Sequence, residues 1–490
     1  MRGRTVFTVF IAATVVAIIT IYAISTIGIF DHIPRNYNEG WNAYQVQALL
    51  QGQPLYPAWN KPWVNNYPPL SFYVVAALSL ATHDVIVSGR LISLVGILVT
   101  GFNIGAISAA LTGNKLSGLV AALFFLIAVG VWFQSYVAMN DPQWLGHGLQ
   151  TTGALILLAS AQSRRPSLAP VVLGAALMFS GCIVKHSLVV LPPIVWGVLL
   201  IKDRKACVVM TVVFLVLGLA FILFAFAMYG RPLFEQVLDY QRVTRFVRGV
   251  RYLSKFAFVV VPAVVFALLN LALSPSDWRS GFPSVYALFG CLVGGYALCG
   301  EGINYNALFD VVIAMALTVG SLFSVLPGLH EFGGVSPTFS STLSALLLFA
   351  PIGSNFYELT ASAESVITRP SELPLARSVV DALADAKGPV ACEIPAWCFW
   401  ADKPIAYDVF SMAERAKRGG SEEARFVDRV ANGYYAAIET QSNVQLTEQK
   451  KRAYWDALTR NYKLTISEPT EVWARKIPDT HGPQVSSPGE

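Results

Sequence analysis

The stretch VFTVFIAATVVAIITIYAISTIGIF, residues 6–30, decides the class of this fold because it contains no charged side chain. A helix needs roughly 20 apolar residues to cross the hydrocarbon core of a membrane. The run is longer than the apolar part of a secretory signal, and it lacks a clear small-residue cleavage site. We therefore predict an uncleaved first membrane span, with a cleaved signal peptide as the alternative.

The composition of the whole chain agrees with a membrane protein. Apolar residues make up 54% of the sequence and charged residues only 13%, against about a quarter charged in soluble proteins. Residues 361–490 carry 34 of the 65 formal charges, which indicates a membrane domain followed by a soluble one. The net charge of +5 is spread thinly, without a basic patch interleaved with aromatic residues. No nucleic-acid partner is therefore expected.

Ten further apolar runs predict a mainly α, polytopic transmembrane helix bundle of about eleven spans. Pro192 and Pro193 lie inside the sixth span, where they are expected to kink the helix. The ten runs are residues 88–111, 116–137, 144–162, 167–184, 187–201, 207–229, 255–274, 282–300, 303–326 and 338–353.

Basic residues in the loops predict the topology, because cytoplasmic loops are enriched in Lys and Arg. A cytoplasmic N-terminus places most of the basic loops on the same side as Arg2 and Arg4. This arrangement requires YPPLSFYVVAALSLA, residues 67–81, to lie along the outer surface as an interfacial or re-entrant helix. Residues 230–255 are the exception. The topology places this Arg-rich segment on the outer side, where basic residues are not expected.

We divide the chain into a membrane domain, residues 1–354, with a first outer loop at 31–87, and a C-terminal periplasmic domain, residues 355–490. The second domain alternates predicted helices with strands at 389–395, 435–440 and 471–477, as expected for a small α/β domain. Cys392 and Cys398 could form a disulfide in an oxidising compartment or pack unpaired.

Ionisable residues gather on the outer side in this topology. Glu39 follows the first span, Asp141 the third and Glu301 the ninth. Such groups are costly near a membrane, which makes them functional candidates. Each has a structural alternative: the first two could cap helices, and Glu301 could be an exposed loop residue. Three basic residues lie on the same side: Arg90, Lys185 and His186, of which the last two could be interfacial anchors.

Two outer carboxylates beside basic groups suit the transfer of a group from a phosphate. One carboxylate can act as general base, and Lys, Arg or a metal can stabilise the leaving phosphate. Tyr67 and the neighbouring aromatic residues could form a sugar platform or an interfacial belt.

The order of these motifs resembles the GT-C superfamily of polytopic glycosyltransferases over residues 1–325. NEGWNAY (38–44) stands where that family has an acidic motif, commonly Asp-Glu followed by Tyr, and NYPPLSFY (66–73), which contains Tyr67, follows in the same loop. Four further segments continue the series: SGRLISL with Arg90, MNDPQW with Asp141, the pair Lys185 and His186, and GINY with Asn304.

The resemblance implies a bacterial inner-membrane glycosyltransferase that moves a sugar from a polyprenyl-phosphate donor to a lipid or glycan acceptor on the periplasmic side, usually with inversion. Asn38 occupies the first acidic position of the motif. Because Asn cannot take a proton, the role of the catalytic base moves to Glu39 or Asp141.

The resemblance also suggests a role for the Arg-rich segment. Arg242, Arg245 and Arg248 could form a flap that binds the donor phosphate, or a surface helix on anionic headgroups. Clustered carboxylates and Asn304 could hold a divalent cation, although no spacing is diagnostic and no cofactor is assigned.

Two other functions remain open. A transporter or flippase of a lipid-linked sugar should place its ionisable residues near the bilayer midplane and show inverted repeats, and no repeat is visible here. A non-catalytic partner in envelope glycan assembly would use the C-terminal domain as its binding module.

Overall fold

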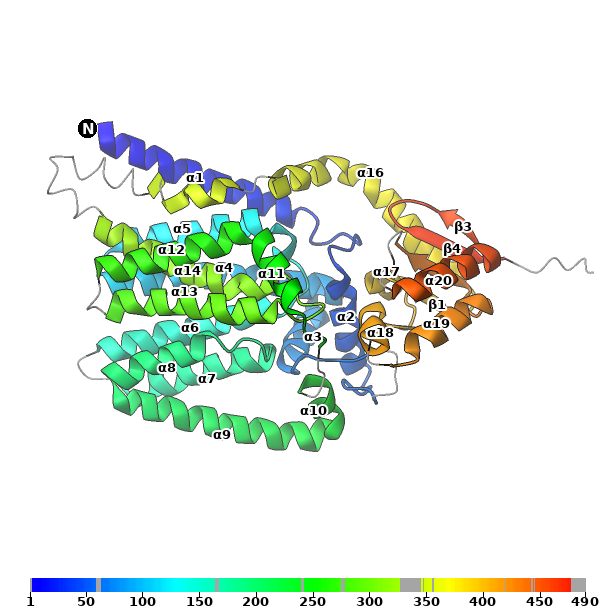
Figure 1. The fold of residues 1–490 in the computed structure, drawn as a ribbon, viewed down its shortest axis with the longest axis horizontal. Coiled ribbons are helices and arrows are strands. Elements are labelled where there is room, and N and C mark those ends of the chain that lie inside the picture. The colour runs from blue at the N-terminus through cyan, green and yellow to red at the C-terminus, as the bar shows by residue number, and fades with distance from the viewer. Residues whose placement is uncertain are drawn as a thin grey trace, which may run out of the picture. The chain divides into compact units, whose positions relative to one another are not determined.

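The computed structural model describes two compact units, Met1–Pro370 and Ser371–Glu490. The first unit is built of helices and the second contains a four-stranded sheet (Figure 1). The described residues are 2–58, 63–163, 167–238, 242–274, 278–326, 345–346, 348–354, 357–417, 419–441, 444 and 446–476.

Helices occupy the predicted spans of the first unit. They are α1 (Arg2–Thr26), α4 (Val85–Thr112), α5 (Lys115–Trp132), α6 (Gln143–Gln162), α7 (Leu168–Val184), α8 (Leu191–Lys202), α9 (Arg204–Tyr229), α12 (Ala257–Leu273), α13 (Trp278–Ala297) and α14 (Phe309–Val325). The eleventh predicted span, 338–353, lies mostly outside the described residues.

Within the described part of the chain, five helical segments are long and apolar enough to cross a membrane: α1, α4, α5, α9 and the segment containing α14. The pair α11 (Phe246–Lys255) and α12 would make a sixth, although the two helices are bent by 82° where they meet. Helices α7 and α8 are apolar but shorter. The chain is therefore a multi-pass membrane protein, with fewer full-length spans by this measure than the eleven predicted.

Pro192 and Pro193 do not kink a helix, so that prediction was wrong. Helix α8 begins at Leu191, which places both prolines in its first turn. Proline is favoured there because the backbone N–H groups of a first turn have no helical partner to lose.

Helix α14 forms the centre of the bundle, where it packs against α4, α5, α12 and α13. Its side chains are buried from Phe309 to Phe323, whereas most residues of α9 are exposed. Small residues allow the closest crossings. A Cβ at Gly153 of α6 would lie 2.5 Å from the Gly174 carbonyl oxygen of α7, so a larger residue would force these helices apart.

Two shorter helices, α2 (Tyr37–Leu50) and α3 (Leu70–Thr82), occupy residues 31–87, the segment predicted to be the first outer loop. Helix α3 falls within the segment predicted to lie along the outer surface, and it packs against α2, α4 and α7. The 3-10 helices η1 (Gln134–Tyr136) and η2 (Tyr305–Leu308) stand at the ends of α5 and α14.

The Arg-rich segment contains α10 (Arg231–Val237) and α11 (Phe246–Lys255). The chain between them pairs with the end of α13 through an antiparallel bridge of Thr244 with Gly300. This bridge fixes the start of α11 beside residues 298–303.

The second unit confirms the predicted small α/β fold. Its sheet has the order β1-β2-β4-β3, with β1 parallel to β2 and the other pairs antiparallel. Cys392 and Cys398 form a disulfide. The elements from the border of the two units onward are α16 (Tyr357–Asp385), β1 (Val390–Cys392), α17 (Pro395–Trp400), α18 (Val409–Ala416), α19 (Glu422–Ala431), β2 (Ala437–Thr440), α20 (Glu448–Asn461), β3 (Tyr462–Ile466) and β4 (Glu471–Arg475).

The sequence did not predict β3, because this strand follows α20 without a loop and alternates poorly. Only Tyr462, its first residue, is fully buried, and the next three residues are exposed. The period-two pattern that identifies a half-buried strand is therefore missing.

Candidate active site

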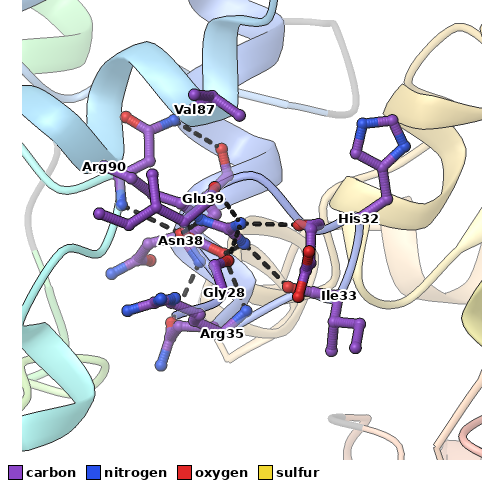
Figure 2. A network of polar contacts seen from close by, with 12 residues as sticks. Gly28, His32, Ile33, Arg35, Asn38, Glu39, Val87 and Arg90 are labelled. Carbon is purple, nitrogen blue, oxygen red and sulfur yellow. Dashed lines mark hydrogen bonds and ion pairs between the residues drawn. The ribbon is translucent and has the colours of Figure 1, made fainter. Parts of the chain in front are cut away.

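Glu39 and Arg90 form a buried ion pair between α2 and α4 (Figure 2). Both side chains are 0% exposed. The Arg90 Nε and Nη2 atoms each lie 2.8 Å from one Glu39 carboxylate oxygen, so the pair is bidentate, which is the strongest geometry of this contact.

Arg90 also joins the end of α1 to the outer loop. Its Nη1 group donates to the carbonyl oxygens of Gly28, Ile29 and Asp31, and its Nη2 group donates to the Ile33 carbonyl oxygen. All the N–H directions of this guanidinium are therefore engaged inside the protein.

The Glu39 carboxylate has a full set of hydrogen bonds. Besides Arg90, it accepts from the backbone N–H of Arg35 at 2.8 Å and from that of Asn140 at 3.1 Å. Burial raises the pKa of Glu39, but the Arg90 charge, its hydrogen bonds and Arg35 together lower that pKa below its ordinary value. Four donors occupy the lone pairs of a carboxylate, so Glu39 is held as an anion.

Asn36, not Glu39, caps helix α2. The Asn36 side chain accepts from the backbone N–H of Asn38, and Glu39 lies in the first helical turn. Asn38, the residue at the missing acidic position, is partly buried beside Glu39 (Figure 2).

Asn140 connects Glu39 to Asp141. Its side-chain amide donates to the Glu39 carbonyl oxygen at 3.0 Å, and its own carbonyl oxygen accepts from Asn42 at 2.8 Å. Gly89 on α4 leaves space for this contact, since a Cβ there would lie 1.7 Å from the Asn140 Oδ1 atom. The loop that carries Asp141 is therefore fixed from two helices.

Asp141 is buried but incompletely bonded. Its Oδ1 atom accepts from the backbone N–H of Gln143 at 2.9 Å and lies 3.8 Å from Lys185 Nζ. Its Oδ2 atom is buried and has no hydrogen-bond partner among the described residues. The contact with the Gln143 N–H thus uses one oxygen of Asp141, and the other has no partner in the described part of the chain.

Gln143 links the groups around Asp141 and was not among the predicted site residues. Its Oε1 atom accepts from Lys185 Nζ at 2.8 Å, and its Nε2 atom donates to the Asn306 carbonyl oxygen at 2.8 Å. One helical turn later, the Nε2 atom of His147 lies 3.4 Å from the Nε2 atom of Gln143. The spacing of Gln143 and His147 on one face of α6 was the only signal in the sequence.

Aromatic residues surround Lys185 and Asp141. Lys185 Nζ lies 5.0 Å from the centre of the Tyr67 ring, which meets Trp41 edge to face. Tyr136 packs against Tyr305. Burial first, and the Asp141 carboxylate second, raise the pKa of Tyr136 well above its ordinary value, so this hydroxyl stays neutral.

Glu301 and two arginines of the Arg-rich segment form a separate group. Arg245 Nε lies 3.1 Å from a Glu301 carboxylate oxygen, with 63% of the Arg245 side chain exposed. Arg242 donates to the Glu301 carbonyl oxygen at 3.2 Å. Arg248 differs, because its guanidinium donates to the carbonyl oxygens of Leu298 and Ile303.

The structure thus places the predicted residues in three groups: Glu39 with Arg90, Asp141 with Lys185 and Tyr67, and Arg242 and Arg245 with Glu301. His186 is exposed in the loop beside Lys185. Asn304 caps η2 through the Tyr305 N–H. Among the described residues, no group of three or more His, Cys, Asp or Glu side chains could hold a metal ion.

No protein-family model matches the chain, and no curated protein matches it in sequence. Solved structures match it in fold. ArnT from Cupriavidus metallidurans bound to undecaprenyl phosphate has a TM-score of 0.62 and 11% identity, covering 97% of this chain and 100% of that one. The Archaeoglobus fulgidus oligosaccharyltransferase in the apo form has a TM-score of 0.54 and 11% identity, covering 95% and 75%.

A complex of the archaeal oligosaccharyltransferase AglB, from the same organism, with an inhibitory peptide and a dolichol-phosphate gives a TM-score of 0.52 at 12% identity, again over 95% and 75%. At these identities the likeness concerns the fold. The chain therefore has the GT-C fold of these polytopic membrane proteins, as the order of its sequence motifs predicted.

Proposed function

We propose that the chain is a bacterial inner-membrane glycosyltransferase, which transfers a sugar from a polyprenyl-phosphate donor to a lipid or glycan acceptor on the periplasmic side. The fold supports this, because the similar structures include ArnT bound to undecaprenyl phosphate and AglB with a dolichol-phosphate. Both ligands are long isoprenoid chains that end in a phosphate.

The observation that carries the proposal is the Asp141 carboxylate. It is 3% exposed, it has one oxygen without a hydrogen-bond partner among the described residues, and it lies at ion-pair distance from Lys185. A base needs a free lone pair, and a leaving phosphate needs a nearby cation.

In the proposed reaction, Asp141 takes the proton of the acceptor hydroxyl while the hydroxyl oxygen attacks the anomeric carbon of the sugar. The bond from that carbon to the phosphate oxygen breaks, and its electron pair leaves with the polyprenyl phosphate. Attack from the face opposite the phosphate inverts the anomeric centre. Lys185 stabilises the charge on the departing phosphate, and Tyr67 supports the sugar ring.

Glu39 and Arg90 position the site in this proposal, because neither has a free lone pair or N–H for a substrate. Glu39 fixes the loop of Asn140, and therefore Asp141, through two hydrogen bonds, and Arg90 holds the Glu39 carboxylate in place. Arg242 and the exposed Arg245 are the proposed contacts to the donor phosphate. Arg248 holds their segment against the bundle.

We also place the C-terminal domain in the periplasm, where an odd number of spans after a cytoplasmic N-terminus would bring it. The Cys392–Cys398 disulfide supports this location, since disulfides persist in oxidising compartments.

Purified protein in lipid vesicles, supplied with a radiolabelled polyprenyl-phosphate sugar and a lipid extract as acceptor, tests the proposal. Label should move to the acceptor with the native chain and be lost with Asp141→Asn. Asp203→Asn is the matched control, because Asp203 also accepts a helix N–H bond, at the start of α9. Undiminished transfer by Asp141→Asn would disprove the site, and no transfer by the native chain would disprove the function.

A further inference from the structure

A small cavity lies beside Asp141, between α2, α3, α4 and the start of α6. Its volume is about 10 Å³, which is room for one water-sized occupant. Most of its wall is apolar and comes from Val46, Phe72, Val75, Ile92 and Leu145.

Three residues of the wall carry a buried oxygen that has no hydrogen-bond partner among the described residues: Asn42 Oδ1, Ser71 Oγ and Asp141 Oδ2. Each of these residues is 3% exposed. The orientation of Asn42 follows from its other amide atom, since Nδ2 donates to the Asn140 carbonyl oxygen. Native proteins rarely leave buried polar atoms unsatisfied, so three around one cavity indicate an occupant.

The chemistry of these three atoms selects the occupant. The Asn42 and Asp141 oxygens only accept hydrogen bonds, whereas the Ser71 hydroxyl can also donate. A water molecule satisfies all three by donating to the two acceptors and accepting from Ser71, and three bonds are typical of a buried water. A divalent cation would need about six oxygen ligands, twice the number of these oxygens.

We propose that this cavity binds one water molecule, through which Asn42 and Ser71 act as positioning residues for Asp141. The water donates to one lone pair of Asp141 Oδ2, while Oδ1 accepts from the backbone N–H of Gln143. The second lone pair of Oδ2 stays open for the acceptor proton. A hydrogen bond to the ionised form favours that form. Lys185 and Tyr136 also lie near this carboxylate. The water is a further, uncharged hydrogen-bond donor to it.

Ser71→Val tests the site because the larger apolar side chain fills the cavity and removes one partner of the water. Ser79→Val is the matched control, since Ser79 is buried on the same helix α3 but bonds to the Ala76 carbonyl oxygen. If Ser71→Val does not fold, Ser71→Ala removes the donor without adding volume.

A structure at a resolution that shows ordered water is the first measurement. Density within hydrogen-bond distance of all three oxygens is expected in the native chain and in Ser79→Val, and not in Ser71→Val. An empty cavity in the native chain, closure by rearranged side chains, or an occupant at metal–oxygen distances of about 2.0–2.6 Å would overturn the proposal.

The positioning role rests on the proposed function and has a separate measurement. Ser71→Val should lower kcat for sugar transfer about tenfold with KM unchanged. Loss of the water with an unchanged kcat would refute the positioning role. A bound water in a protein that transfers no sugar would support the site and refute the proposed function.

Discussion

Glu39 and Asp141 are buried carboxylates joined through one residue, Asn140, and their surroundings differ in kind. Four donors surround the Glu39 carboxylate. One oxygen of Asp141 has no partner among the described residues. The pair shows that an acid just after a membrane span is not necessarily a base, because its free lone pairs decide whether it can take a proton.

The difference also separates stability from activity. A buried ion pair contributes little net stability, yet removing one partner leaves an uncompensated charge. An incompletely bonded carboxylate lowers stability and keeps a reactive lone pair. The Glu39 region should therefore respond to mutation mainly by unfolding, and the Asp141 region mainly by loss of turnover.

Asp141→Asn should produce the largest effect on activity. The amide keeps the shape and the contact to the Gln143 N–H, but it cannot take a proton, so kcat should fall about 10²–10⁴-fold. The melting temperature should stay close to that of the native protein. Sugar transfer and thermal unfolding of the same preparation measure both, and a large drop in melting temperature would contradict the contrast.

Arg90→Met should produce the largest effect on stability. It leaves the Glu39 charge buried without its partner, at a cost of about 3–5 kcal/mol. Thermal unfolding in detergent measures this loss. The double variant Glu39→Leu with Arg90→Met removes both charges and should be more stable than Arg90→Met alone; an equally unstable double variant would assign the effect to the lost contacts with Gly28, Ile29 and Asp31.

Lys185→Met should lower turnover by roughly 10²-fold, as expected for loss of one group that stabilises transition-state charge. Lys185→Arg should restore part of the rate because the charge returns, although its geometry to Gln143 changes. Steady-state kinetics give the result. Equal rates for the Met and Arg variants would show that the charge of this side chain is not used.

Stability at low pH should depend on Glu39. Its pKa is lowered in the folded protein, so its contribution is present above the unfolded pKa of about 4.3 and is lost as pH falls through the lower folded value. Glu39→Gln should therefore flatten part of the acid limb of melting temperature against pH. If the acid limb of Glu39→Gln is identical to that of the native protein, protonation of Glu39 does not contribute to the loss of stability at low pH.

Arg245→Gln should have the smallest effect on stability, below about 1 kcal/mol, because its bridge to Glu301 is largely exposed. If the side chain binds the donor phosphate, KM for the polyprenyl-phosphate sugar should rise while kcat changes little. Arg231→Gln is a matched control, since Arg231 also forms an exposed bridge, to Glu235. The same KM for both variants would remove Arg245 from the site.

Much of the fold could be predicted from the sequence because membrane helices are encoded locally. Long apolar runs gave helices close to α4, α6 and α13, and the alternation of helices with short strands along the C-terminal domain gave β1, β2 and β4. The prediction failed at Pro192, which lies in the first turn of α8 and does not kink a helix, and at β3, which has no clear alternation of buried and exposed residues.

The candidate site was predicted only in part. Topology brought Asp141 and Lys185 to one side, and the structure places them at ion-pair distance. Gln143 was missed because a neutral amide gives no charge signal, although it bonds to Lys185 and Asn306.

The sequence by itself determined that this is a multi-pass membrane protein with a small α/β domain, because hydrophobicity and periodicity depend on neighbouring residues in the chain. Only the tertiary structure decided which carboxylate is saturated and which has a free oxygen. Those contacts join residues about 50 to 100 positions apart, such as Glu39 with Arg90 and Asn140. Hydrogen-bond saturation is a property of packed groups in three dimensions, so no local pattern records it.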